Sequence, residues 1–177
     1  DSTGPDEEAL ANPVVCERDA VSLELGLTGA AVAAGSQVEV PVTITNTGQV
    51  PCLLDVGSGS LEVVVTSGDD TVWTTAQCPP GQQEQRILLA TGAVEERTIT
   101  WSGRRSAAEC PSDTRQARAG TYRVQVSLAV DGGADGGGKV DAWEPPATDG
   151  LSRPRVGVAN RHEDPNGCGA ELVVPLH

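Results

Sequence analysis

His162, Glu163 and Asp164 form the one place in this sequence where a general base and carboxylates cluster. A base beside carboxylates is the kind of arrangement that a hydrolytic site requires. Adjacent residues on an extended chain point apart, however, and no serine or cysteine motif supplies a nucleophile. Cys168 follows closely, but a thiol near a histidine is not a catalytic pair by spacing alone. The sequence therefore predicts a protein that is not an enzyme and has no catalytic residues.

Four arginines lie close together in one polar stretch, at Arg104, Arg105, Arg115 and Arg118. Arginine pairs bidentately with carboxylate and phosphate groups, so the four are a candidate binding patch for an anionic envelope polymer or an acidic partner. The alternative is a solvated loop whose arginines offset the acidic remainder of the chain through exposed ion pairs. A patch requires the four side chains to converge on one face, and we expect them to be dispersed instead.

Two further groups of residues have a structural explanation that we prefer. Asp131, Asp135 and Asp141 surround a glycine-rich turn, but their spacing is not that of an EF-hand, so we expect a linker and no metal site or cofactor. Trp73 and Trp101 could stack on sugar rings. Because the chain has three Trp, one Tyr and no Phe, we expect both tryptophans to fill the core instead.

The five cysteines, at positions 16, 52, 78, 110 and 168, lack the spacing of a zinc site. They favour disulfides and an oxidising compartment over reduced thiols in a cytosolic protein. Two bridges among five cysteines can be drawn in fifteen ways. We predict Cys16–Cys52, because an antiparallel first strand pair brings these two together, and Cys78–Cys110, which ties the two longest loops. Cys168 is then left over.

The net charge of −13, from 25 acidic and 12 basic residues, argues against a nucleic-acid-binding protein. No apolar run reaches the length of a membrane span. These features suit a secreted or cell-surface protein, and a signal or an anchoring segment upstream of Asp1 stays open.

Short segments of alternating apolar and polar residues fill the chain as far as residue 130, and no stretch of a dozen residues shows a helical period. The expected strands are 21–27, 37–45, 52–56, 61–66, 71–75, 87–90, 94–101 and 121–130. Pro41, inside the second of them, favours an edge strand or a bulge there. The fold class predicted is all-β, an immunoglobulin-like antiparallel β-sandwich of seven to nine strands with flexible tails.

The domain organisation follows from composition. We expect a disordered acidic leader at 1–13, the sandwich at 14–130, a glycine-rich linker or long hairpin loop at 131–138, and an extension at 139–177. The extension is either three added strands, near 140–143, 156–159 and 171–176, or a loosely ordered tail. The residues predicted to form the core are Val38, Val40, Val42, Ile44, Val63, Val65, Trp73, Leu88, Ile99, Trp101, Val124 and Val126.

Four landmarks occur in a fixed order within residues 36–130. They are the strand ending in Asn46-Thr47-Gly48, Val72-Trp73 after a Gly-Asp turn, Thr100-Trp101 after an Ala-Thr-Gly turn, and Gly120-Thr121-Tyr122 opening a strand. This order resembles the bacterial immunoglobulin-like sandwich of the BsuPI family of intracellular proteinase inhibitors. The chain departs from that family in an aromatic-poor strand at 61–65 and in having cysteines. Its cysteine pattern is similar to that of small secreted domains of high-GC bacteria, in which an early Cys is bridged to one just after the Asn-Thr-Gly turn.

The sequence is therefore compatible with two functions from different classes. The first is a non-catalytic extracellular or cell-envelope interaction module that binds another protein by its strand edges or loops. The second, which rests on the resemblance, is a proteinase inhibitor whose candidate inhibitory segment is the loop 77–85 beside Cys78.

Overall fold

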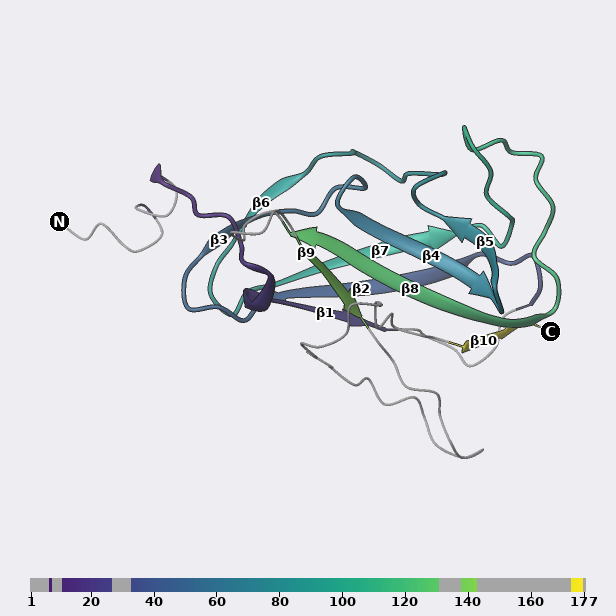
Figure 1. Ribbon diagram of the computed structural model, residues 1–177, viewed down its shortest axis with the longest axis horizontal. Helices are drawn as coiled ribbons and strands as arrows, with labels where there is room; N and C mark the ends of the chain where they lie inside the picture. The colour runs from purple at the N-terminus through teal and green to yellow at the C-terminus, as the bar shows by residue number, and fades with distance from the viewer. Residues whose placement is uncertain (1–6, 8–10, 27–32, 131–137, 143–172, 177) are drawn as a thin grey trace, which may run out of the picture.

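Two antiparallel sheets packed face to face form the body of the protein in the computed structural model (Figure 1). The structure describes residue 7 and residues 11–26, 33–130, 138–142 and 173–176. The first sheet has the order β1-β2-β7 and consists of β1 (Val21–Leu25), β2 (Val38–Asn46) and β7 (Val94–Trp101). The second has the order β10-β8-β4-β5 and contains β4 (Leu61–Ser67), β5 (Asp70–Thr74), β8 (Gly120–Val130) and β10 (Val173–Leu176), with β9 (Gly138–Ala142) also paired to β8. The all-β sandwich predicted from the sequence is confirmed.

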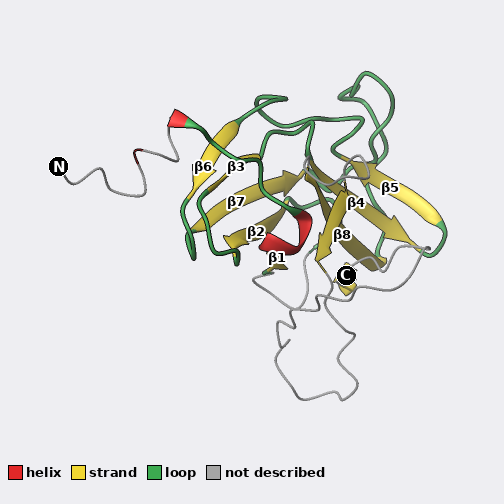
Figure 2. Ribbon diagram, turned by 60° about the vertical axis from the view of Figure 1, so that its left-hand side comes forward, coloured by secondary structure: helices red, strands yellow, loops and turns green. Residues whose placement is uncertain are grey.

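A smaller two-stranded sheet, β3 (Cys52–Asp55) and β6 (Arg86–Leu89), completes the described fold together with the short 3-10 helix η1 (Arg18–Ala20) (Figure 2). The chain segment that precedes the sandwich forms backbone hydrogen bonds with β3. The Cys16 N–H donates to the Leu53 carbonyl, and the Leu53 N–H donates to the Val14 carbonyl. The start of the described body is thereby held to the small sheet.

Period-two burial produces the core, as the sequence predicts. In β2 the buried residues Val38, Val40, Val42 and Ile44 alternate with more exposed ones, and β8 shows the same alternation. Burial of each large aliphatic side chain contributes about 1.5–3 kcal/mol to the free energy of folding, because its apolar surface is removed from water. Trp101 is fully buried, and its ring packs against that of Tyr122 with 5.5 Å between centroids.

The prediction that Leu88 belongs to the core is wrong. Leu88 is half-buried, and its neighbour Leu89 is buried instead. Strand β6 pairs with β3 so that Leu89 lies opposite the buried Cys52, and Leu88 lies opposite the half-buried Leu53. Because side chains alternate across a strand, only one of the two leucines can face the core.

The expectation for Pro41 is also corrected, because β2 is the central strand of its sheet and not an edge. The Gly26 N–H donates to the Pro41 carbonyl, so the backbone of Pro41 faces the side of β1. Strand β1 ends at Leu25, one residue earlier. The missing N–H of Pro41 therefore costs the sheet a bond only beyond the end of β1, and the ladder with β7 continues through this position.

The turn after β2 is held by a buried side chain. Asn46 is fully buried, and its Nδ2 donates to the carbonyls of Val50 and Leu89, at 2.9 Å each. Its Oδ1 accepts the Gly48 N–H at 2.8 Å. Asn46 thus closes the turn and joins the first sheet to the small sheet beside it.

The C-terminal part contributes two described strands, both on the same edge of β8. Strand β10 pairs with the beginning of β8 at Gly120–Arg123, and β9 pairs with its end at Val126–Val130. These strands overlap two of the three segments predicted near 140–143 and 171–176. The predicted segment 156–159 lies outside the described residues.

Candidate functional site

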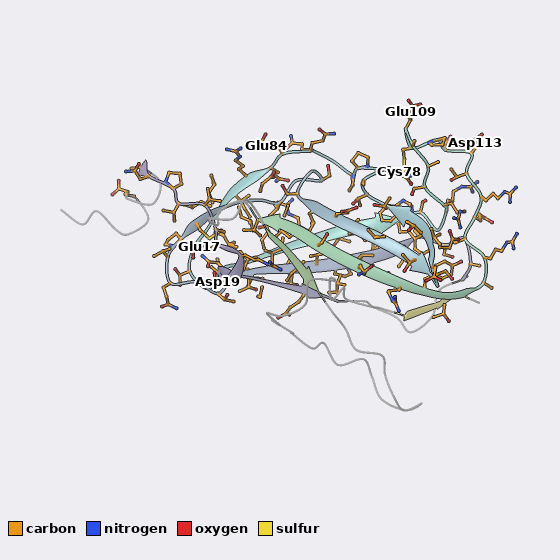
Figure 3. The ribbon with its side chains drawn as sticks, viewed as in Figure 1. Glu17, Asp19, Cys78, Glu84, Glu109 and Asp113 are labelled. Carbon is orange, nitrogen blue, oxygen red and sulfur yellow. A yellow bond between two sulfur atoms is a disulfide. The ribbon has the colours of Figure 1, made fainter. Side chains whose placement is uncertain are left out.

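Two long loops joined by a disulfide form a candidate functional site, which we call the loop surface and define as residues 76–85 and 102–119. Cys78 and Cys110 are bonded, with an S–S distance of 2.09 Å and 4.9 Å between their Cα atoms. Cys78 lies near Glu109 and Asp113 at one end of the sandwich, and the first loop runs from there to Glu84 beside β6 (Figure 3). Residues 76, 77 and 79–84 are exposed. The loop surface is therefore a large solvent-facing region with a covalent tie at one end.

The beginning of the first loop is fixed by more than the disulfide. The N–H groups of Gln77 and Cys78 both donate to the Thr74 carbonyl, at 3.2 Å each. The Ser106 hydroxyl bonds to Gln77 Oε1 and also accepts the Thr74 N–H at 3.0 Å. Ser106 thus joins the second loop to the place where the first one leaves β5.

The far end of the first loop is held against the segment that follows β3. Backbone N–H groups of Ser58 and Gly59 donate to the carbonyls of Gln82 and Gln83, at 2.9 and 2.8 Å. This approach is close enough that a Cβ on Gly57 would lie 2.4 Å from the Gln83 carbonyl oxygen. Only glycine fits there without a shift of the backbone.

Asp55 anchors the same junction electrostatically. Its carboxylate accepts the N–H groups of Gln85 at 2.7 Å and Gly57 at 2.9 Å, and the Ser60 hydroxyl at 2.8 Å. Burial by itself raises the pKa of Asp55, but the hydrogen bonds from Gln85, Gly57 and Ser60 and the charge of Arg86 outweigh it and hold the pKa below its usual value. The ionised form of Asp55 therefore stabilises the loop.

The second loop folds back on itself next to Trp101. The Arg105 N–H donates to the Arg115 carbonyl, and the Ala117 N–H donates to the Gly103 carbonyl, at 2.8 Å each. Trp101 Nε1 donates to the Arg104 carbonyl at 2.8 Å, so the buried indole also fixes the loop. The second loop is thus built on the core.

The loop also covers the outer edge of β5. The Ser106 N–H donates to the Val72 carbonyl at 3.0 Å, and the Arg105 guanidinium contacts the Thr71 carbonyl at 3.3 Å. The edge of the second sheet is therefore occupied by the chain's own backbone and side chains.

The four arginines predicted as a binding patch are not equivalent in the structure. Arg104 donates to the Thr114 carbonyl at 2.6 Å. Arg105 forms a bidentate pair with Asp70, with both bonds at 2.7 Å, and this hydrogen bonding lowers the pKa of Asp70. Arg115 and Arg118 are exposed, and within the described residues their side chains have no ion-pair partner. Two of the four are thus engaged in holding the loop, and two remain available to a ligand.

The other predicted site residues fall into two groups. Trp73 and Trp101 are buried, 5% and 0% exposed, so neither offers a flat ring to a sugar. His162, Glu163, Asp164, Cys168, Asp131 and Asp135 lie outside the described residues, and only the backbone of Asp141, in β9, is described. Within the described part of the chain, no three His, Cys, Asp or Glu side chains come together as a metal site would require.

Both disulfide pairings are those expected from the sequence. Cys16 and Cys52 are bonded at 2.05 Å, as Cys78 and Cys110 are at 2.09 Å. Two disulfides in one small sandwich suggest an oxidising environment. No helix within the described residues is long and apolar enough to cross a membrane.

Sequence reasoning missed the two polar residues that position the loop surface, Asp55 and Ser106. Asp55 precedes a Gly-Ser-Gly-Ser run, and the pattern of an aspartate followed two residues later by glycine is typical of a side chain that caps its own turn. This local pattern could have predicted the contact of Asp55 with the N–H group two residues later. The contact of Asp55 with Gln85 joins residues 30 positions apart, and no local pattern indicates it.

Comparison with known proteins gives no family assignment. No known protein family and no curated protein sequence matches the chain, and there is no match specific to BsuPI inhibitors. Among solved structures, the C-terminal domain of wzt is 8% identical, with a TM-score of 0.42, over 74% of this chain and 76% of that one.

Two further solved structures show a similar level of likeness. The CARDB domain of a Pyrococcus furiosus protein is 13% identical, with a TM-score of 0.33, over 68% of this chain and 84% of that one. A β-glucosidase from Listeria innocua is 13% identical, with a TM-score of 0.39, and this chain spans 15% of its length. With all TM-scores below 0.5, these likenesses carry no argument about function.

Proposed function

We propose that this chain is a non-catalytic, secreted or cell-envelope interaction module that binds another protein through the loop surface. One observation carries the proposal: the exposed segment 76–84 is restrained at both ends, by the Cys78–Cys110 disulfide and by the backbone bonds of Gln82 and Gln83. A loop that is already ordered loses little conformational entropy when a partner binds it, and pre-organisation of this kind raises affinity.

Charge supports a protein partner over an anionic polymer. Of the four candidate arginines, Arg104 and Arg105 already have partners within the molecule. Glu84, Glu109 and Asp113 lie on the same loops and are exposed. A surface of mixed sign suits a protein with complementary charges better than it suits a uniformly anionic polymer.

The test uses cross-linking of the purified protein to the envelope of the bacterium that produces it. A variant combining Pro80→Arg and Asp113→Arg changes two exposed loop residues and raises the net charge by about three units. The matched control combines Val50→Arg, in the exposed turn between β2 and β3, with Glu17→Arg, which is also exposed and gives the same change of charge. We expect a defined cross-linked protein whose yield falls at least tenfold in the loop variant and stays unchanged in the control. Absence of any cross-linked protein, or equal yields from all three chains, would contradict the proposal.

A proteinase inhibitor is the second candidate, and the same restrained loop favours it. Inhibitors that present a loop to a protease cleft require a backbone that keeps its shape after contact, and residues 77–85 meet that requirement at both ends. Incubation with serine, cysteine and metalloproteases tests the idea. Stoichiometric inhibition that disappears on the change Pro80→Arg would support it, and cleavage or indifference across the panel would exclude it.

A further inference from the structure

The free edge of β7 lies open in the described structure. The Asn46 N–H donates to the Ala93 carbonyl at 3.1 Å, and the register continues from this pair along β2 and β7 to Val38 and Trp101. In an antiparallel ladder, the residues that bond to the neighbouring strand alternate with residues that turn away from it. The residues of β7 whose N–H and C=O groups turn away from β2 are therefore Val94, Glu96, Thr98 and Thr100.

No described strand pairs with this side of β7, which is the outer strand of the β1-β2-β7 sheet. The corresponding edge of the other sheet, at β5, is covered by Arg105 and Ser106. An uncovered row of backbone donors and acceptors is the feature to which an extended peptide adds as a further strand.

A pocket of about 200 Å³ lies directly beside this edge. Arg97, Thr98 and Ile99 of β7 form one wall, and the loop residues Pro80, Gly81, Gln82 and Gln85 form another, with Val56 and Leu61 among the remaining lining residues. The apolar part of the lining suits an aliphatic side chain that points toward the interior of the sandwich.

The opposite face of the same sheet is acidic. Residues of β1, β2 and β7 that point away from the core include Glu24, Glu39 and Glu96, and none of these outward positions carries Lys or Arg. Glu96 lies in β7, the strand whose outer edge is open. A basic side chain on the outer face of an added strand would therefore meet Glu96 as its neighbour.

We propose that the free edge of β7 binds an extended segment of a partner protein in which basic residues alternate with aliphatic ones. The backbone of that segment bonds to Glu96, Thr98 and Thr100, its aliphatic side chains face the pocket, and its basic side chains face Glu96. This inference deepens the proposed function by naming the chemistry of a partner. Pro80 belongs both to the loop surface and to the lining of this pocket, whereas Asp113 does not line it, so Asp113→Arg alone is the loop variant that tests the loop surface without changing the edge site.

The probes are two fluorescein-labelled peptides with blocked ends, the alternating TKVKVKT and the equally charged, non-alternating KKKVVTT. Binding is measured by fluorescence anisotropy at physiological salt, where long-range attraction to an acidic protein is screened. We expect the alternating peptide to bind at least ten times more tightly than the other. Equal binding of the two peptides, or no binding, would overturn the proposal.

Two pairs of variants place the peptide on β7. Thr98→Pro removes an outward N–H at an edge position where proline is tolerated, and we expect at least a tenfold loss, whereas Thr98→Ser should bind normally. Glu96→Lys should weaken binding at least fivefold. Glu24→Lys, the same charge change on the same face but on the far strand β1, should weaken it less than twofold.

Each remaining outcome is also decisive. If Thr98→Pro does not fold, the comparison of Glu96→Lys with Glu24→Lys decides alone, and equal effects of these two would overturn the proposal. If the protein without peptide forms dimers that Thr98→Pro abolishes, a second copy occupies the edge and the proposal is wrong. Loss of peptide binding in Asp113→Arg alone together with normal binding in Thr98→Pro would place the peptide on the loops instead.

Discussion

The two disulfides close loops of similar length in opposite surroundings. Cys16 and Cys52 are 36 residues apart and are 0% and 3% exposed, whereas Cys78 and Cys110 are 32 residues apart, with Cys78 half-buried and Cys110 exposed. The chain-entropy model assigns each closure about 4 kcal/mol, since the cost depends on loop length alone. Any difference between the bridges must therefore come from the folded state.

That difference divides the molecule into a part that sets its stability and a part that sets its surface. Around Cys52, the buried Asn46 and the core residue Leu54 leave little room for rearrangement. Around Cys110, both Cys110 and Glu109 have a positive φ, of 49° and 64°, in an exposed turn. The second bridge holds a conformation that the local sequence does not favour by itself.

Removal of the buried bridge is expected to have the largest effect. Cys16→Ala combined with Cys52→Ala should lower the free energy of unfolding by about 5 kcal/mol, because the cross-link is lost and a cavity is left beside the core. Urea unfolding without reductant measures it. If the free energy of unfolding falls no further than it does on removal of the exposed bridge, the buried bridge does not set the stability of the molecule.

Removal of the exposed bridge should cost less, about 2–3 kcal/mol. In the variant with Cys78→Ala and Cys110→Ala, the freed loops regain conformational entropy in the folded state, which offsets part of the loss. Amide hydrogen exchange should rise at residues 76–84 and stay unchanged in β2 and β8. Protection that persists in the first loop would show that Ser106 and Asp55 hold it without the disulfide.

Asp55→Ala should lower stability by about 1–2 kcal/mol at neutral pH, because three hydrogen bonds to a carboxylate are lost. The folded-state pKa of Asp55 lies below the ordinary 3.8, so this contribution is complete above that value and is lost as the pH falls through the lower folded-state pKa. The difference between wild type and variant should therefore shrink in acid. A difference that grows in acid would contradict a folded-state pKa of Asp55 below its ordinary value.

Arg105→Gln should have the smallest effect. Its bidentate pair with Asp70 is exposed, so solvent and salt screen it, and the hydrogen bonds of the Ser106 backbone still cover β5. The urea midpoint should remain at the wild-type value in 0.5 M salt. A marked decrease there would show that Arg105 anchors the second loop.

The framework was readable from the sequence because its signals are local. Alternation at Val38, Val40, Val42 and Ile44 indicates a strand with one buried face wherever that strand lies in the sheet. The position of the strand within its sheet is a different matter. Pro41 indicated an edge strand or a bulge, and the structure places it in the central strand with an unbroken register to β7, because the missing N–H falls just beyond the end of β1.

The candidate site was less readable because its contacts are distant in sequence. The loop 77–85 could be recognised as exposed and as tied at Cys78, but its second attachment depends on Asp55 and Gly59, more than 20 residues earlier. The separation of Arg104 and Arg105 from Arg115 and Arg118 likewise depends on Asp70 and Thr114 as partners. Composition gives the number of arginines in a loop, and the fold determines which of them are free.

The Cys16–Cys52 bridge also determines how the protein would respond to mechanical force. Tension applied at the two ends of the chain passes from Cys16 to Cys52 through the sulfur atoms, so the covalent load path bypasses β1 and β2, which lie between them, while the bond is intact. Each residue extends by about 3.4 Å, and the closed loop therefore withholds about 120 Å of chain from the stretched length. A molecule on the outside of a cell that is pulled at its ends could not extend the chain of these two strands until a reductant opened the bond.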